Sequence, residues 1–422
     1  MKLDNLNDRQ LKAPRPFHTM WIILFIVLIL LGAIAFLIGI SGNLSERAWH
    51  VYLINFVFWI GLSSGAVFFV AVMNMTKSKW ARPAKRLGEA FGAFLPVSFL
   101  LFWVLYFGRK EIFPWIGEPI PGKEAWLNVR FLFARDGIGL LLLSVISAAL
   151  IYYSIKGDKE VASQPLGRRE KVIDSNENAD KRQDSPNWRA QVYLSPILGI
   201  AYGFVLSLIA IDLVMSLDSH WVSTLFGAYF FLSSFYLGLA ALTIVSALSL
   251  NSFGLKDYIH SLYFHDLGKL VFAFCLLTGY FFYAQFLVIW YGNIPEETQY
   301  VILRVRQSPW EPLAWTVLGA AFILPFVVLL SRKIKMKPIS LMVLSTLILI
   351  GMWLERFLLV APSFWKGNGI PIGTLEILIT AGFLGLMALS LITFLRRFPF
   401  LPLSDPLFQE FLESERTRKV TL

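Results

Sequence analysis

The chain has 422 residues, of which 56% are hydrophobic and 16% are charged, with a formal net charge of +10 and a mean hydropathy of +0.63. A soluble domain of ordinary composition carries about 25% charged residues, so this composition excludes a soluble globular fold. The one cysteine, Cys275, excludes disulfides and a cysteine-ligated iron–sulfur cluster within this chain.

Apolar runs along the chain are long enough to cross a bilayer, which takes about 20 helical residues. The sequence therefore predicts an all-α, polytopic membrane protein. We expect ten spans, at 19–41, 51–75, 88–107, 136–155, 192–215, 224–250, 267–290, 311–331, 338–361 and 374–395.

The basic residues indicate how these spans are oriented. Most of the 38 Lys and Arg residues lie in alternate connections, on the side that also holds both termini. Because cytoplasmic loops are enriched in Lys and Arg, both termini are expected in the cytoplasm, and the basic charge does not indicate nucleic acid.

The chain is therefore expected to divide into five parts. Within the last of them, residues 406–417 are predicted to form a short amphipathic surface helix. The parts are a cytoplasmic basic arm (1–18), a first membrane half (19–155), a polar cytoplasmic linker (156–191), a second membrane part (192–395) and a cytoplasmic tail (396–422).

A short internal repeat relates the second to fifth spans to the sixth to ninth. Leu62-Ser63-Ser64 in span two matches Leu232-Ser233-Ser234 in span six, and Asp212 in span five matches Glu355 in span nine. Matching spans run in the same direction, so the pattern predicts a parallel repeat of two four-helix bundles.

Polar side chains inside the apolar spans are the candidates for a proton path or a quinol site. A charged side chain at the bilayer centre costs about 2.5–3.5 kcal/mol on insertion scales, so each is expected to have a partner. Six lie at similar depth near the outer face: Asp136, Asp212, Gln285, Glu355, Arg356 and Glu376.

We expect these six groups to cluster around Arg356. Adjacent residues point about 100° apart on a helix, so Arg356 is expected to pair with Asp212 or Glu376 rather than with Glu355. Asp136 and Glu376 lie nearest the interface, where a solvated acid at a helix N-terminus is favourable. The alternative is an ion network that only holds the helices together.

At the cytoplasmic end, Glu89, Asp266 and Lys269 are candidates for the end of a water wire lined by hydroxyl side chains. The alternative for Asp266 and Lys269 is an interfacial cap of span seven. All five histidines lie in predicted loops or at span ends, where they could not hold a haem inside the bundle, and no catalytic or metal-ligating motif is present.

Three segments carry a resemblance to a known family: Ser-Leu-Asp-x-x-Trp-x-Ser-Thr at 216–224, His-Asp-Leu-Gly-Lys at 265–269 and Ile-Trp-Tyr-Gly-Asn-Ile-Pro-Glu-Glu-Thr at 289–298. Together with the ten spans they are similar to the quinol-oxidoreductase-like membrane subunits of bacterial alternative complex III, in the NrfD/polysulfide-reductase group. The resemblance covers about 15–400.

The resemblance implies two four-helix bundles plus two peripheral helices, in the bacterial inner membrane. It implies a subunit of a menaquinol-oxidising oxidoreductase complex that passes electrons to cytochrome c or an oxidase. This chain is expected to hold no redox centre and to bind no cofactor or metal itself. It is expected to support assembly and is a candidate for proton translocation.

The implied partners are a sister NrfD-like membrane subunit, an iron–sulfur subunit, c-type cytochrome subunits and lipids. Menaquinol, the iron–sulfur clusters and the c-type haems would belong to those subunits, and the outer connections 108–135 and 292–310 are expected to contact them. Two alternatives stay open: a quinol-binding NrfD-type anchor of another redox complex, and a secondary transporter.

Overall fold

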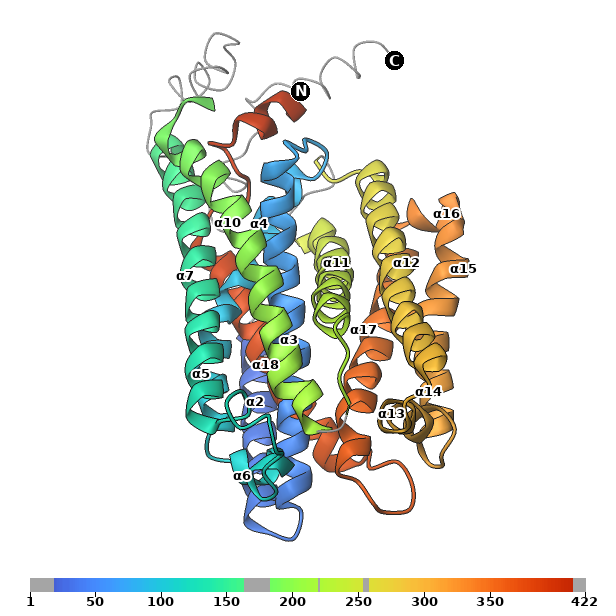
Figure 1. Cartoon of the computed structure of the whole chain (residues 1–422). Coiled ribbons are helices and arrows are strands. Elements are labelled where there is room, and N and C mark those ends of the chain that lie inside the picture. Colours follow the sequence, from blue (N-terminus) through green and yellow to red (C-terminus); the bar gives the residue numbers. More distant parts are fainter. Residues whose placement is uncertain (1–18, 163–182, 219–220, 253–257, 413–422) are drawn as a thin grey trace.

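The computed structural model describes residues 19–162, 183–218, 221–252 and 258–412 (Figure 1). Within these ranges the chain is all-α, and ten helices are long and apolar enough to cross a membrane, which confirms the predicted fold class. The spans are α2 (Thr19–Ser41), α3 (Ser45–Met75), η2 to α5 (Arg82–Leu105), α7 (Val129–Ala162), α10 to η6 (Pro186–Leu217), α11 (Phe226–Ser252), α12 (Ser261–Gly292), α14 to α15 (Trp310–Leu330), α17 (Pro338–Val360) and α18 (Thr374–Arg397).

Several helices begin about one turn or more before the predicted spans. For example, α3 begins at Ser45, α7 at Val129 and α10 at Pro186. The start of α10 follows its sequence, because the Ser185 hydroxyl accepts the Trp188 N–H as an N-cap and proline occupies the next position. A hydropathy pattern marks only the apolar centre of such a helix, so its polar first turns escape detection.

Helix contacts divide the spans into the two predicted four-helix bundles. The first bundle contains α3, α4 (Lys85–Phe91) with α5 (Leu95–Leu105), α7 and α10. The second contains α11, α12, α14 (Trp310–Val317) with η8 (Leu318–Ile323) and α15 (Leu324–Leu330), and α17. The bundles join where α3 packs along α11.

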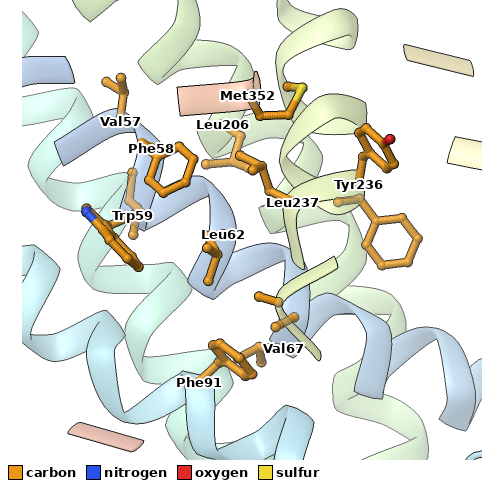
Figure 2. Packing of buried hydrophobic residues seen from close by; sticks show 14 of the residues in the cluster. Val57, Phe58, Trp59, Leu62, Val67, Phe91, Leu206, Tyr236, Leu237 and Met352 are labelled. Carbon is orange, nitrogen blue, oxygen red and sulfur yellow. The ribbon is translucent and has the colours of Figure 1, made fainter. Parts of the chain in front are cut away.

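The crossing of α3 and α11 depends on small residues. A Cβ atom on Gly238 would lie 2.3 Å from the Ala66 nitrogen, and one on Gly65 would lie 2.2 Å from the Ser234 carbonyl oxygen. Only glycine permits such backbone contact. The matching tripeptides at 62–64 and 232–234 lie on the two helices of this crossing, whose buried residues include Leu62 and Leu237 (Figure 2).

The helices α2 and α18 form a separate pair beside the first bundle and pack against α3. They meet at Gly32 and Gly382, where a Cβ atom on Gly32 would lie 2.6 Å from the Gly382 Cα. The outer face of α2 carries exposed apolar residues such as Ile23 and Ile38. These two helices are the peripheral pair that the family resemblance implies.

An even number of spans places the start of α2 and the end of α18 at the same end of the molecule, which we call the terminal end (Figure 1). Connections at the other end, called the opposite end, include two helical stretches, α6 (Arg109–Ile112) and α13 (Pro295–Val305). The predicted linker lies largely in 163–182, outside the described residues.

The helix predicted at 406–417 is present over 406–412, and 413–417 lie outside the described residues, but the helix does not lie free on a surface. The segment 400–409, which we call the strap, packs into the terminal end of the first bundle. Leu403, Leu407 and Phe408 are almost fully buried there, as is Asp405. The short amphipathic pattern fits a protein surface as well as a lipid surface, so the sequence did not distinguish the two.

Candidate functional site

All six polar residues predicted near the outer face lie toward the opposite end, but they form separate sites instead of one cluster around Arg356. Among the described residues, Arg356 bonds neither Asp212 nor Glu376. Each of these acids has an arginine of its own, from a segment that the sequence interpretation had assigned to outer loops.

In the first bundle, the Asp212 site contains Trp126, Arg135, Asp136 and Asp212. The Arg135 guanidinium donates to both carboxyl oxygens of Asp212 at 2.5 Å, and the Trp126 indole N–H donates at 2.9 Å. Arg135 also stacks over the Trp126 ring at 3.9 Å. Asp212 lies on η5 (Ala210–Val214), a π-helical turn that continues α10, and such turns are frequent at functional sites.

Asp136 is fully buried in this site and is not the solvated N-terminal acid that the sequence suggested. Its helix begins at Val129, so Asp136 lies two turns inside α7. No N–H or O–H donor among the described residues reaches either carboxyl oxygen. The Asp136 carboxyl group interacts electrostatically with the carboxyl group of Asp212 and with the Arg135 guanidinium.

In the second bundle, the Glu355 site contains Tyr229, Ser233, Glu355 and Arg356. The Tyr229 hydroxyl donates to Glu355 at 2.5 Å, and Arg356 donates to Glu355 at 2.7 Å and to the Ser233 hydroxyl at 2.7 Å. The adjacent pair therefore does meet, contrary to the expectation. Tyr229 and Ser233 lie one turn apart on α11, so they are on the same face of that helix. Tyr229 binds Glu355 and Ser233 binds Arg356, which brings these two side chains together at that face.

The two sites share a composition: each has a buried carboxylate, one arginine and one aromatic N–H or O–H donor. Asp212 and Glu355 are 0% and 6% exposed, and their donors are Trp126 and Tyr229. The two carboxylates occupy corresponding spans of the two bundles, so this likeness agrees with the predicted internal repeat.

Glu376 forms a third site, at the first turn of α18. Its carboxylate receives two bonds from Arg47, at 2.6 and 2.7 Å, and one from the Gly373 N–H at 2.7 Å. The helix N-terminus was predicted, but Glu376 is fully buried rather than solvated. This site joins the peripheral helix α18 to α3.

Gln285 lies apart from the acids and accepts a hydrogen bond from Ser223 at 3.0 Å. It lines a cavity of about 380 Å³ in the second bundle, which Glu355 and Tyr229 also line. Tyr300 and Trp221, stacked at 3.8 Å between ring centroids, lie at the opposite-end side of this cavity. Burial raises the pKa of Tyr300 to about 12 despite the neighbouring Arg304, so the hydroxyl is neutral at physiological pH.

At the terminal end, Glu89 belongs to a buried charge network that the sequence did not reveal. Arg86 contacts both Glu89 and Asp158, and Asp158 accepts the N–H and hydroxyl of Ser404 at 2.8 and 2.7 Å. Asp405 accepts from Lys85 and Arg82 at 2.7 and 3.0 Å.

The basic residues of this network are fully buried, although by sequence they appear only as loop charges that set the topology. Asp266 and Lys269 lie elsewhere, as an exposed pair at 2.8 Å in the second turn of α12. This geometry favours the interfacial cap over the end of a water wire shared with Glu89. The sequence signal for part of the network is the spacing of Arg86 and Glu89, which one helical turn brings together. Nothing local to span three points to Asp158 or Asp405.

Two four-helix bundles with a peripheral helix pair and buried acid sites define a polytopic membrane subunit rather than a soluble enzyme. The family model described as "Polysulphide reductase, NrfD" matches residues 39–366. The chain therefore belongs to the NrfD/polysulphide reductase family of membrane subunits. No curated protein matches it significantly.

Proposed function

We propose that this chain is the ActF-type membrane subunit of a bacterial alternative complex III, in the inner membrane. Beside it would lie a sister NrfD-like subunit, an iron–sulfur subunit and c-type cytochrome subunits, which would hold the menaquinol site, the clusters and the haems. The family match over 39–366 supports this proposal, as do the motifs at 216–224, 265–269 and 289–298.

Within that complex the chain supports assembly and moves protons. The observation that carries the proton role is the pair of buried carboxyl groups, Asp136 and Asp212, in the first bundle. Glu355, a single carboxyl group beside Arg356 and Tyr229, is included because it occupies the corresponding span of the second bundle. At the Asp212 site, two buried carboxyl groups face one guanidinium. An uncompensated buried charge is costly, so one carboxyl group retains a proton that it can exchange. An ion pair that only locks helices needs no second carboxyl group.

Three conservative variants test this role in the purified complex, reconstituted in vesicles: Asp212→Asn, Glu355→Gln and the control Glu376→Gln. The control removes a buried carboxylate of the same kind at the peripheral helix pair. We expect the first two to lower proton translocation at least twofold per electron transferred, or quinol turnover if the steps are tightly coupled, and the control to leave both unchanged.

Rates must be compared at equal haem content, because removing one partner of a buried pair costs about 3–5 kcal/mol. Parental proton translocation in both test variants contradicts the proton role. Failure of both to assemble also counts against it and favours a packing role for the two sites. Co-purification of c-type haem and iron–sulfur absorbance with this chain tests the assignment to the complex itself.

A second candidate is a quinol-binding NrfD-type anchor of another redox complex. The cavity beside Glu355 favours it, because small-molecule sites have volumes of about 300–1,000 Å³ and mostly apolar walls. This alternative predicts a different set of co-purifying redox subunits, without the c-type cytochromes.

A further inference from the structure

The connection between α5 and α7 contains a pocket of about 470 Å³ at the opposite end of the molecule. Its lining comes from this connection and the first residues of α7, between Trp115 and Arg130. Side chains such as Ile120 and Leu127 make the walls largely apolar. Ligand sites have volumes of about 300–1,000 Å³, so the pocket is large enough to hold a short piece of peptide.

Trp115 supplies an unpaired hydrogen-bond donor to the wall of this pocket. It lies on η4 (Pro114–Ile116) and is 6% exposed, and its indole nitrogen has no hydrogen-bond partner among the described residues. Leaving a buried donor unpaired is costly, and an indole N–H can only donate. A bound group therefore has to offer a hydrogen-bond acceptor, such as a carbonyl oxygen.

A free positive charge lies where the pocket meets α7. The Arg130 side chain is exposed, and no hydrogen bond or ion pair joins it to another described residue. Because α7 begins at Val129, the positive end of its dipole adds to this charge. Glu124 also lines the pocket, but its carboxylate already accepts the Gly122 N–H at 3.0 Å. A second carboxylate, placed beside Arg130, is therefore stabilised.

The pocket shares its segment of chain with the Asp212 site. Glu124 and Leu127 line the pocket, and Trp126 lies between them in the sequence. The Trp126 indole donates to Asp212 at 2.9 Å, and its carbonyl oxygen accepts from Arg135 at 3.1 Å. A molecule bound in the pocket therefore restricts the segment that carries this donor.

We propose that the pocket docks an extended, acidic segment of an extramembrane redox subunit. A backbone carbonyl of that segment accepts from Trp115, and an Asp or Glu side chain pairs with Arg130. An extended peptide offers carbonyl groups, an acid and apolar side chains together, which matches the three kinds of wall. The proposal rests on the proposed function for the presence of such a subunit, and it deepens that function by naming the site and the chemistry of the contact.

Site-specific photocrosslinking in the intact, purified complex tests this proposal. The photoreactive residue p-benzoylphenylalanine replaces Glu118, which is exposed beside the lining residue Pro119, so the probe does not fill the pocket. We expect crosslinks from position 118 to a peptide of an extramembrane subunit that contains Asp or Glu. Salt screens exposed charges, so the yield should fall as ionic strength rises.

Three variants link the crosslink to the pocket, each compared at equal content of the crosslinked subunit. Arg130→Gln removes the free charge, and Trp115→Phe removes the indole N–H but keeps an aromatic ring. Each should lower the yield at least about threefold, as expected for one hydrogen bond or ion pair. The matched control is Lys110→Gln, which removes an exposed positive charge of α6 outside the pocket and should leave the yield unchanged.

The proposal is overturned if the intact complex gives no crosslink from position 118 to another subunit. It is also overturned if Arg130→Gln or Trp115→Phe gives as high a yield as Lys110→Gln. Neither result bears on the proposed function, which the composition of the purified complex decides. A complex that contains the c-type cytochrome and iron–sulfur subunits but gives no crosslink rejects the docking site alone.

Discussion

Substitution of Asp405 tests directly whether buried charges hold the strap at the terminal end. It is 2% exposed, and its carboxylate bonds Lys85 at 2.7 Å and Arg82 at 3.0 Å. Asp405→Asn keeps the size and one oxygen acceptor but removes the negative charge. Two cations whose side chains are at most 1% exposed would then lack their carboxylate.

The size of the effect follows from these contacts. Burial raises the pKa of Asp405, but Arg82 and Lys85 outweigh it and leave the pKa below its ordinary value, so the group is ionised at neutral pH. Removing one partner of a buried pair costs about 3–5 kcal/mol. We expect the lower end, because Arg82 keeps Asn74 and Lys85 keeps Gln191 as partners. About 3 kcal/mol corresponds to a roughly 150-fold larger population of detached strap.

Chymotrypsin can report that population in detergent-solubilised protein, because it cleaves after Phe400 and Phe408, which are buried while the strap is docked. When docking is fast relative to cleavage, the cleavage rate follows the detached fraction. The matched control is Glu410→Gln, whose partner Lys79 is half exposed, so this pair is worth about 0–1 kcal/mol.

We expect cleavage of the strap to rise about 100-fold or more in Asp405→Asn and less than about sixfold in Glu410→Gln. If the Asp405 variant is cleaved at the rate of the parent or of the control, then the buried charges do not hold the strap, and the apolar contacts of its leucines and phenylalanines do.

Three further outcomes follow from the structure. Because the pKa of Asp405 is lowered, its contribution to stability is present above the unfolded pKa of about 3.9 and is lost as pH falls through the folded pKa. The difference in exchange protection of the strap between the parent and Asp405→Asn, corrected for intrinsic rates, should therefore be constant from about pH 8 to 5 and shrink only in stronger acid. Gly238→Leu should separate the bundles and cost about 1–3 kcal/mol or more, seen as a lower monodisperse yield in size-exclusion chromatography, whereas Gly203→Leu, with nothing within 4 Å of its Cβ, should not. In the assembled complex, 108–135 and 292–310 should exchange amide hydrogens more slowly than in the isolated chain, and equal rates would contradict their role as contact surfaces.

The sequence by itself determined the ten spans and their grouping into two bundles. Span hydropathy is a local property, because each helix satisfies its own backbone and needs only enough apolar residues to cross the bilayer. The tripeptides at 62–64 and 232–234 and the positions of Asp212 and Glu355 assigned the spans to the same two bundles that the helix contacts show. The parallel repeat itself stays a prediction.

Only the tertiary structure decided which groups meet. Angular separation along one helix predicted that Glu355 and Arg356 would part, but long side chains bend toward whatever faces them, and Tyr229 and Ser233 of α11 face both. Likewise, the hydropathy pattern placed Arg135 in a loop. In the structure α7 begins at Val129, before its apolar centre, and Arg135 on this helix pairs with Asp212.

The strap shows the same limit at the terminal end. Asp405 is separated from Arg82 and Lys85 by more than 300 residues, so no local pattern relates them. The same charged residue types occur near a membrane surface whether their side chains face water or pair with each other. A hydropathy pattern therefore predicts all of them to be solvated. Their burial is decided by how the ends of α4, α7 and α10 leave a space that the returning chain fills.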